Sequence, residues 1–134
     1  MRYTAEEAVA FLDAIGPAGR SAYTRFLWLD LAVMVLLGGI TLVLVVDWLR
    51  RRLAPDRSRL DWLALVPIQV SVFDAIENFA LLLSLPAPAN AAGTLTLASY
   101  ATSAKHGIGR ILMPSLVAGF GWLAIRRLVG RRRS

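Results

Sequence analysis

Three polar residues interrupt a long apolar segment, residues 60–85: the carboxylates Asp74 and Glu77 and the carboxamide Asn78. On a helix these positions are three and four residues apart, so their side chains share one face. Ionisable side chains within a membrane-spanning helix are energetically unfavourable, and they usually face a partner or a hydrated cavity rather than lipid. Asp74 and Glu77 are therefore candidates for a general acid or base.

The composition indicates a membrane protein. Of the 134 residues, 57% are hydrophobic, and they form long blocks rather than amphipathic stripes. Such blocks are typical of polytopic membrane proteins and not of soluble domains. A chain of this length has room for one domain, so we expect residues 1–134 to form a single membrane domain.

Four helices are expected, over about residues 5–15, 22–49, 60–85 and 94–129. The first begins at a capping box from Thr4 to Glu7, ends at the Gly-Pro-Ala-Gly sequence of residues 16–19, and is shorter than the roughly 17 residues that a span needs. It should lie at the membrane surface or pack on the bundle. Pro67 should kink the third helix. The last helix, over about residues 94–129, could be one tilted helix or could break at residues 107–109.

The predicted fold class is all-α, an integral membrane helical bundle with three transmembrane helices plus an N-terminal interfacial helix. The alternative has four transmembrane helices.

The basic residues indicate the orientation of the chain. Five of the 15 Lys and Arg residues fall in residues 50–59 and five in residues 126–133, each group directly after an apolar segment. By the positive-inside rule, three spans place both groups in the cytoplasm, whereas four spans would place the second group outside. We therefore expect a multi-pass protein of the cell membrane with its N-terminus outside and its C-terminus cytoplasmic. The net charge is +6, and most of the basic residues are concentrated directly after the spans. Membrane lipids are therefore expected partners and nucleic acid is not.

This topology places polar residues of all three spans at one depth. Counted from the outer ends of the spans at 1.5 Å per residue, they form a layer about 12–18 Å deep. Arg110 lies deeper and could reach Asp74 by extending toward the surface. The candidate binding residues are Asp30, Asp74, Glu77, Asn78, Thr102, Lys105 and Arg110. Such a layer can bind a molecule, or it can be a structural ion-pair cluster that holds three helices together.

No residue pattern indicates a cofactor or a metal. The chain has no cysteine, and its single histidine, His106, has no second ligand at metal-binding spacing. The glycines at positions 107 and 109 lack the preceding strand of a phosphate-binding loop, and no nucleophile motif is present. We therefore expect neither a cofactor nor a metal.

The polar motifs resemble those of a group of small bacterial polytopic membrane proteins that have no assigned function. The motifs are Gly19-Arg20-Ser21-Ala22-Tyr23 with Asp30, Asp74-x-x-Glu77-Asn78, and Thr102-x-x-Lys105, and together they cover most of the chain. This resemblance implies no particular activity. The frequent use of alanine and arginine favours a bacterial inner membrane. The chain is also loosely similar to emopamil-binding sterol isomerases, in which acidic and amide side chains inside a small helical bundle handle sterol-like ligands. Only the carboxylates inside the bundle match, and the chain is shorter by at least one span.

Three hypotheses of function follow. The first is a ligand-binding or accessory membrane component in which the polar layer sets the helix register. The second is a membrane-embedded enzyme that uses Asp74 or Glu77 as general acid or base on a lipid or isoprenoid substrate, with Lys105 tuning its pKa. The third is a proton- or cation-coupled carrier, which with three spans would need to be a homo-oligomer. The expected ligand is lipid-like or isoprenoid.

Overall fold

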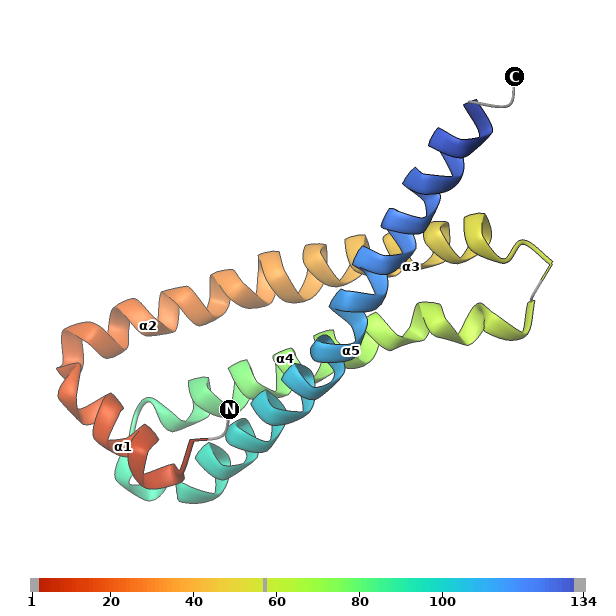
Figure 1. The fold of residues 1–134 in the computed structure, drawn as a ribbon. Helices are drawn as coiled ribbons and strands as arrows, with labels where there is room; N and C mark the ends of the chain where they lie inside the picture. Colours follow the sequence, from red (N-terminus) through yellow and green to blue (C-terminus); the bar gives the residue numbers. More distant parts are fainter. Residues whose placement is uncertain (1–2, 57, 132–134) are drawn as a thin grey trace.

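The chain forms a bundle of long helices (Figure 1). The structure is a computed structural model that describes residues 3–56 and 58–131. In chain order the elements are α1 (Ala5–Ala14), α2 (Gly16–Asp30), the π-helix η1 (Leu31–Gly38), α3 (Gly39–Leu53), the 3₁₀ helix η2 (Ser58–Leu65), α4 (Val66–Ser84), the 3₁₀ helix η3 (Pro88–Asn90) and α5 (Ala92–Arg131). The predicted all-α helical bundle is confirmed.

Three segments of the described chain are long and apolar enough to cross a membrane: Gly16–Leu53, Leu60–Ser84 and Ala92–Val129. α5 continues without a break through residues 107–109, so the alternative with four transmembrane helices is wrong. Large apolar side chains such as Leu83 and Ile111 are mostly exposed, as expected of helices that cross a membrane. The C-terminal half of α5 diverges from α4, passes α3 and projects beyond the bundle (Figure 1).

α1 packs on the bundle, which was one of its two predicted positions. Its start has the predicted capping box: the backbone N–H of Glu7 donates to Thr4 Oγ1 (3.2 Å), and the N–H of Thr4 donates to Glu7 Oε2 (2.7 Å). On its inner face Leu12 is only 1% exposed and belongs to a core with Leu27 of α2 and Leu95 of α5. The N-terminal segment is therefore fixed against both α2 and α5.

Two prolines occupy positions that the sequence analysis did not predict. α2 begins at Gly16 rather than near residue 22, because Gly16 adopts a φ of +63° and lets the chain turn sharply out of α1. Pro17 then lies in the first turn of α2, where no backbone N–H is needed. Pro67 likewise lies in the first turn of α4, where the 3₁₀ helix η2 passes into α4 within the span Leu60–Ser84.

The π-helix η1 turns Asp30 and Gly39 toward the same neighbour. These residues are nine positions apart, about two and a half turns of a regular α-helix, and would then face opposite sides. A π-helix forms i→i+5 hydrogen bonds and takes more residues per turn. As a result Asp30 contacts Asn78 of α4, and Gly39 contacts Ser71 about two turns away on the same helix.

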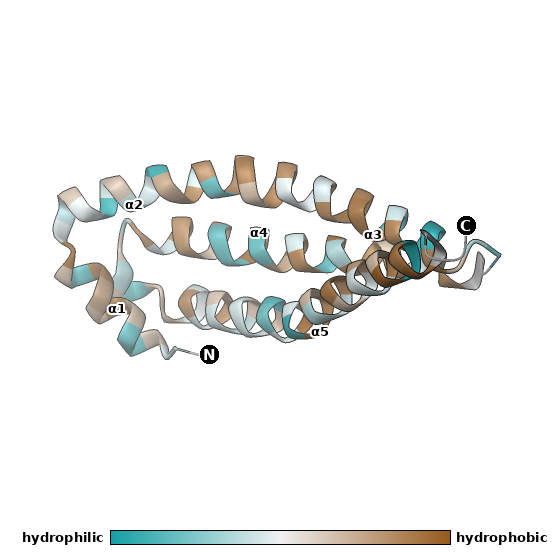
Figure 2. Ribbon diagram, turned by 45° about the horizontal axis from the view of Figure 1, so that its top comes forward, coloured by the Kyte–Doolittle hydropathy of each residue, from teal (hydrophilic) through white to brown (hydrophobic). Residues whose placement is uncertain are grey.

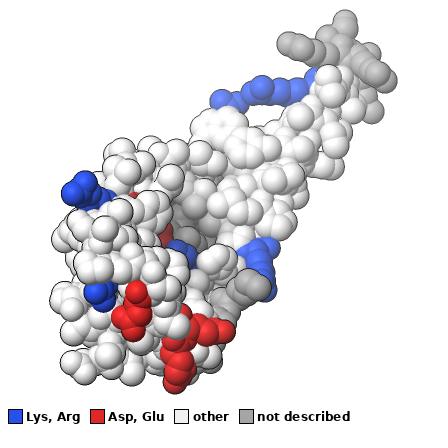
Figure 3. All heavy atoms as spheres, turned by 90° about the vertical axis from the view of Figure 1, so that its left-hand side faces the viewer, with Lys and Arg blue, Asp and Glu red and all other residues white. Residues whose placement is uncertain are grey.

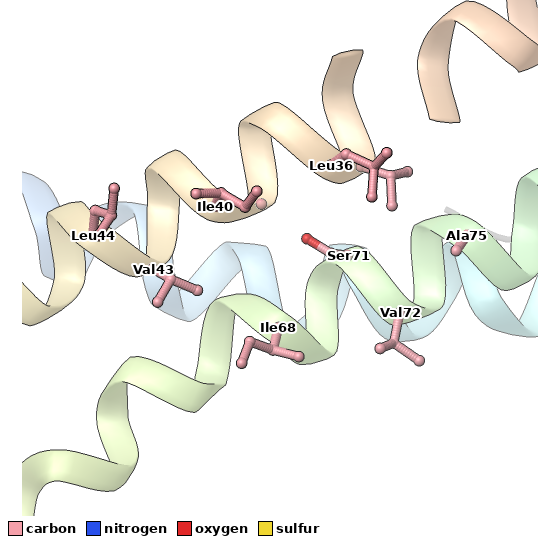
Figure 4. Close-up of a pocket in the computed structure, with 10 residues that line it drawn as sticks. Leu36, Ile40, Val43, Leu44, Ile68, Ser71, Val72 and Ala75 are labelled. Atoms are coloured by element: carbon pink, nitrogen blue, oxygen red, sulfur yellow. The ribbon is translucent and has the colours of Figure 1, made fainter. Parts of the chain in front are cut away.

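α3 and α4 approach each other closely at Gly39. A Cβ added to Gly39 would overlap the hydroxyl of Ser71 and lie 3.2 Å from Ser71 Cβ. Figure 4 shows Ser71 pointing from α4 toward the facing helix, within a groove of about 430 Å³ whose walls are otherwise apolar. The absence of a side chain at this glycine therefore sets the distance between the two helices.

Gly39→Ala should lower the free energy of unfolding by about 1–3 kcal/mol, because Ser71 or a whole helix must shift. Gly38→Ala is the matched control, since its new Cβ would meet only the carbonyl of Val33 at 3.7 Å. Thermal unfolding in detergent, followed by circular dichroism, measures both. Adding Ser71→Ala should restore part of the loss. Equal shifts in Tm for the two glycine variants would contradict the close contact.

Candidate functional site

Lys105 of α5 lies between two carboxylates of α4. Its ammonium Nζ donates to Asp74 Oδ1 and lies 2.6 Å from Glu77 Oε2. The three side chains are 22%, 17% and 14% exposed, so the ion pairs are mostly buried. Figure 2 shows the corresponding hydrophilic turns within the ribbons of α4 and α5. This arrangement joins the two helices with charges that compensate each other in part.

A second polar contact joins α4 to the end of α2. Asn78 Nδ2 donates to Asp30 Oδ2 at 2.6 Å, and Asn78 is only 4% exposed. Five predicted residues thus lie together, and we call them the polar cluster: Asp30, Asp74, Glu77, Asn78 and Lys105. They come from all three spans, at the positions where the depth count predicted a common layer.

Two predicted residues lie at or beyond the edge of the cluster. Thr102 donates its hydroxyl to Ala98 O of its own helix (2.9 Å), and Thr102 O lies 2.7 Å from His106 Nδ1. Arg110 is exposed and forms no ion pair with any described residue, so it does not contact Asp74. The reason is helical geometry: Lys105 and Arg110 are five positions apart, about 140° around the helix. When Lys105 faces α4, Arg110 faces away.

The sequence analysis missed Tyr3. The Ser99 hydroxyl of α5 donates to Tyr3 O (2.5 Å), and this bond holds the N-terminal segment against the bundle. The Tyr3 hydroxyl is buried and has no hydrogen-bond partner among the described residues. No sequence signal placed Tyr3 near the cluster, because the residue precedes the spans and reaches it only through the packing of α1.

Burial raises the pKa of the Tyr3 phenol. The nearby Thr102 hydroxyl lowers that pKa, the Glu77 carboxylate raises it further, and the Lys105 ammonium opposes the rise. The Thr102 hydroxyl donates to Ala98 O, and the Tyr3 hydroxyl has no hydrogen bond with it or with any other described residue. The Tyr3 phenol is therefore within electrostatic range of the polar cluster.

A pocket of about 240 Å³ lies beside the cluster, between α1, α2 and α4. Its lining comprises Tyr3, Glu7, Ala8, Phe11, Leu12, Tyr23, Glu77 and Leu81. We call it the Tyr3–Glu77 pocket. Glu77 Oε2, the oxygen that lies 2.6 Å from the Lys105 ammonium, is also buried here. Buried polar atoms nearly always have a partner, so the Tyr3 hydroxyl, which has none among the described residues, indicates that a further polar group belongs at this pocket.

The charges of the cluster are not balanced. Three carboxylates, those of Asp30, Asp74 and Glu77, face one ammonium, that of Lys105. In surroundings of low dielectric constant, an uncompensated negative charge binds a proton or recruits a cation or a hydrogen-bond donor. No group of three or more potential metal ligands occurs in residues 3–56 and 58–131. The cluster is therefore suited to a hydrogen-bond donor or a cationic group of a ligand.

Comparisons with protein-family models, curated proteins and solved structures find no match for this chain. The function is therefore argued from the geometry of the pocket and the polar cluster.

Stability should fall at alkaline pH because of Tyr3. A phenol in the unfolded chain ionises near pH 10.0, whereas the pKa of folded Tyr3 is higher. Its contribution to stability is therefore complete below pH 10.0 and is lost as the pH rises through the folded pKa. Thermal unfolding measured on both sides of this pH should show a steeper loss for the native protein than for Tyr3→Phe. Parallel pH profiles would mean that the phenol is not buried.

Proposed function

We propose that the protein is a small integral membrane protein that binds a lipid-like ligand with a hydroxyl or amine head group. The observation that carries this proposal is the buried Tyr3 hydroxyl, which has no hydrogen-bond partner among the described residues and shares the wall of one pocket with the Glu77 carboxylate. A hydroxyl head group would accept a hydrogen bond from Tyr3 and donate one to Glu77. An amine would in addition offset the negative charge of the polar cluster.

The size of the Tyr3–Glu77 pocket supports a lipid-like molecule. Pockets for whole drug-sized ligands usually measure about 300–1,000 Å³, and this pocket measures about 240 Å³. It would take a head group and the first carbons, which would contact Phe11, Leu12 and Leu81. The remaining chain of the ligand would lie in the bilayer. An isoprenoid alcohol or amine has this form.

Mass spectrometry of the molecules that co-purify with the detergent-solubilised protein tests the proposal. We expect one alcohol or amine to be enriched over bulk phospholipid. Glu77→Gln should reduce its occupancy about 10–100-fold, which corresponds to the loss of one hydrogen bond to a charged group. Glu6→Gln, the same change at an exposed site of α1, should have no effect. The proposal fails if the native protein carries only bulk phospholipid or if both variants retain the ligand equally.

The same preparation separates binding from catalysis. Added ligand should be recovered unchanged if the protein only binds it. Recovery of an isomerised or otherwise altered molecule, lost in Glu77→Gln, would instead support the enzyme hypothesis with Glu77 as general base.

For the orientation we propose that the N-terminus lies outside and the C-terminus in the cytoplasm of a bacterial inner membrane. The positive-inside rule supports this orientation, because the basic groups in residues 50–59 and 126–133 follow the first and third spans. The Tyr3–Glu77 pocket would then lie in the outer half of the bilayer. A reporter fused after Ser134 that is active only in the periplasm would contradict this orientation.

A further inference from the structure

Another cavity lies toward the opposite end of the bundle from the Tyr3–Glu77 pocket. It measures about 430 Å³ and is lined by Trp48, Arg52, Phe120, Leu123, Ala124, Arg126 and Arg127. We call it the arginine pocket. Counted along α5 from Lys105 to Arg126, it is about 30 Å from the polar cluster, close to the thickness of a bilayer core. Seen from the α1 end in Figure 3, acidic side chains lie on the near part of the molecule together with several basic ones, whereas the charged side chains visible toward the far end of α5 are basic.

Direct contact between α3 and α5 forms this pocket. The rings of Trp48 and Phe120 stack with their centroids 5.9 Å apart, and Arg52 Cζ lies 5.5 Å from the centroid of the Trp48 ring. A Cβ added to Gly119 would lie 2.6 Å from Leu49 Cδ2, so the two helices are close at this level. The pocket therefore has walls built from two packed helices.

The arginines of this pocket differ from their neighbours in having no carboxylate partner. Asp47 accepts from Arg50 (3.0 Å) and Arg51 (2.8 Å), and Asp61 pairs with Arg50 (2.7 Å). None of the ion pairs found in the described parts of the chain includes Arg52, Arg126 or Arg127. Guanidinium groups from two helices thus line one cavity without a carboxylate partner among the described residues.

We propose that the arginine pocket binds the phosphate of an anionic phospholipid. Guanidinium groups bind phosphate oxygens in a bidentate manner, and Trp48 is of the residue type enriched at membrane interfaces. The surroundings favour a lipid over a soluble phosphate or an acidic protein segment. Trp122, Ile125 and Leu128 on the same stretch of α5 are 57%, 55% and 63% exposed, so an occupant must meet apolar surface as well as positive charge. This site is independent of the Tyr3–Glu77 pocket and of its ligand.

Nanodiscs with equal amounts of phosphatidylglycerol and phosphatidylcholine provide the test. The full-length protein is extracted gently, and native mass spectrometry measures the ratio of the two lipids that stay bound. Phosphatidylglycerol should be preferred, and Arg52→Gln should reduce this preference about fivefold, as expected for one arginine near a bilayer surface. Arg51→Gln is the matched control, because it removes the same charge one residue away, on a side chain that pairs with Asp47 and does not line the pocket.

A second variant tests the cavity without a change of charge. Ala124 is exposed and lines the pocket, so Ala124→Phe should fill it without disturbing the core, and the lipid preference should fall. An excess of inorganic phosphate should leave the lipid ratio unchanged; if it displaces the lipid, the site binds phosphate itself. Equal losses in Arg51→Gln and Arg52→Gln would overturn the proposal, since they would indicate diffuse attraction to the basic cluster. An unaltered ratio in Ala124→Phe would overturn it as well.

Discussion

Replacing Lys105 with methionine should destabilise the bundle by about 3–5 kcal/mol, the usual effect of removing one partner from a buried ion pair. The ammonium of Lys105 contacts both Asp74 and Glu77, which are 17% and 14% exposed. Without it, two carboxylates lie close together in surroundings of low dielectric constant with no cation beside them. Methionine keeps about the length of lysine and the apolar character of its methylene chain. The loss of stability therefore reports mainly on the charge. Denaturant titration in mixed micelles, followed by circular dichroism, measures the effect.

Two further variants show whether the loss comes from the ion cluster. Arg110→Met removes a cation from an exposed position of the same helix and should change stability by less than about 0.5 kcal/mol. Adding Asp74→Asn and Glu77→Gln to Lys105→Met should recover most of the loss, because three neutral side chains leave no uncompensated charge. Comparable losses for Lys105→Met and Arg110→Met would mean that the cluster does not stabilise the fold.

The common depth of the polar residues could be predicted from the sequence because it depends on few quantities. The basic groups predict a direction for each span, and a helix rises by a nearly constant 1.5 Å per residue. Counting from the ends of the spans therefore brought Asp30 to the depth of Asn78, and Lys105 to that of Glu77. The structure shows the corresponding contacts. The continuity of α5 was predictable from the placement of the C-terminal arginines.

The direction in which each residue faces was harder to predict. Asp30 and Gly39 both face α4 only because η1 is a π-helix, and no residue pattern in Leu31–Gly38 signals that geometry. Arg110 was included because the count considered depth along the helix axis and not the position of each residue around that axis. Its angle of about 140° from Lys105 could have excluded it. Tyr3 and the pocket beside Glu77 depend on the way α1 packs back onto the bundle. Tertiary packing of this kind is not encoded in local periodicity.

Asn78→Asp should destabilise the protein by about 3 kcal/mol at neutral pH, because it replaces the donor of the Asp30–Asn78 hydrogen bond with a second carboxylate. Asn78 is only 4% exposed, so water cannot screen the repulsion between the two carboxylates.

The exchange variant Asp30→Asn/Asn78→Asp restores one carboxylate and one amide across the same interface. It should regain more than half of the loss, although its carboxylate then lies next to Glu77 in the chain. Asn90→Asp, the same substitution at an exposed position of η3, should leave stability nearly unchanged. Denaturant titration of the four proteins gives the coupling free energy between positions 30 and 78. A coupling near zero would mean that the contact between α2 and α4 does not hold the two helices in register.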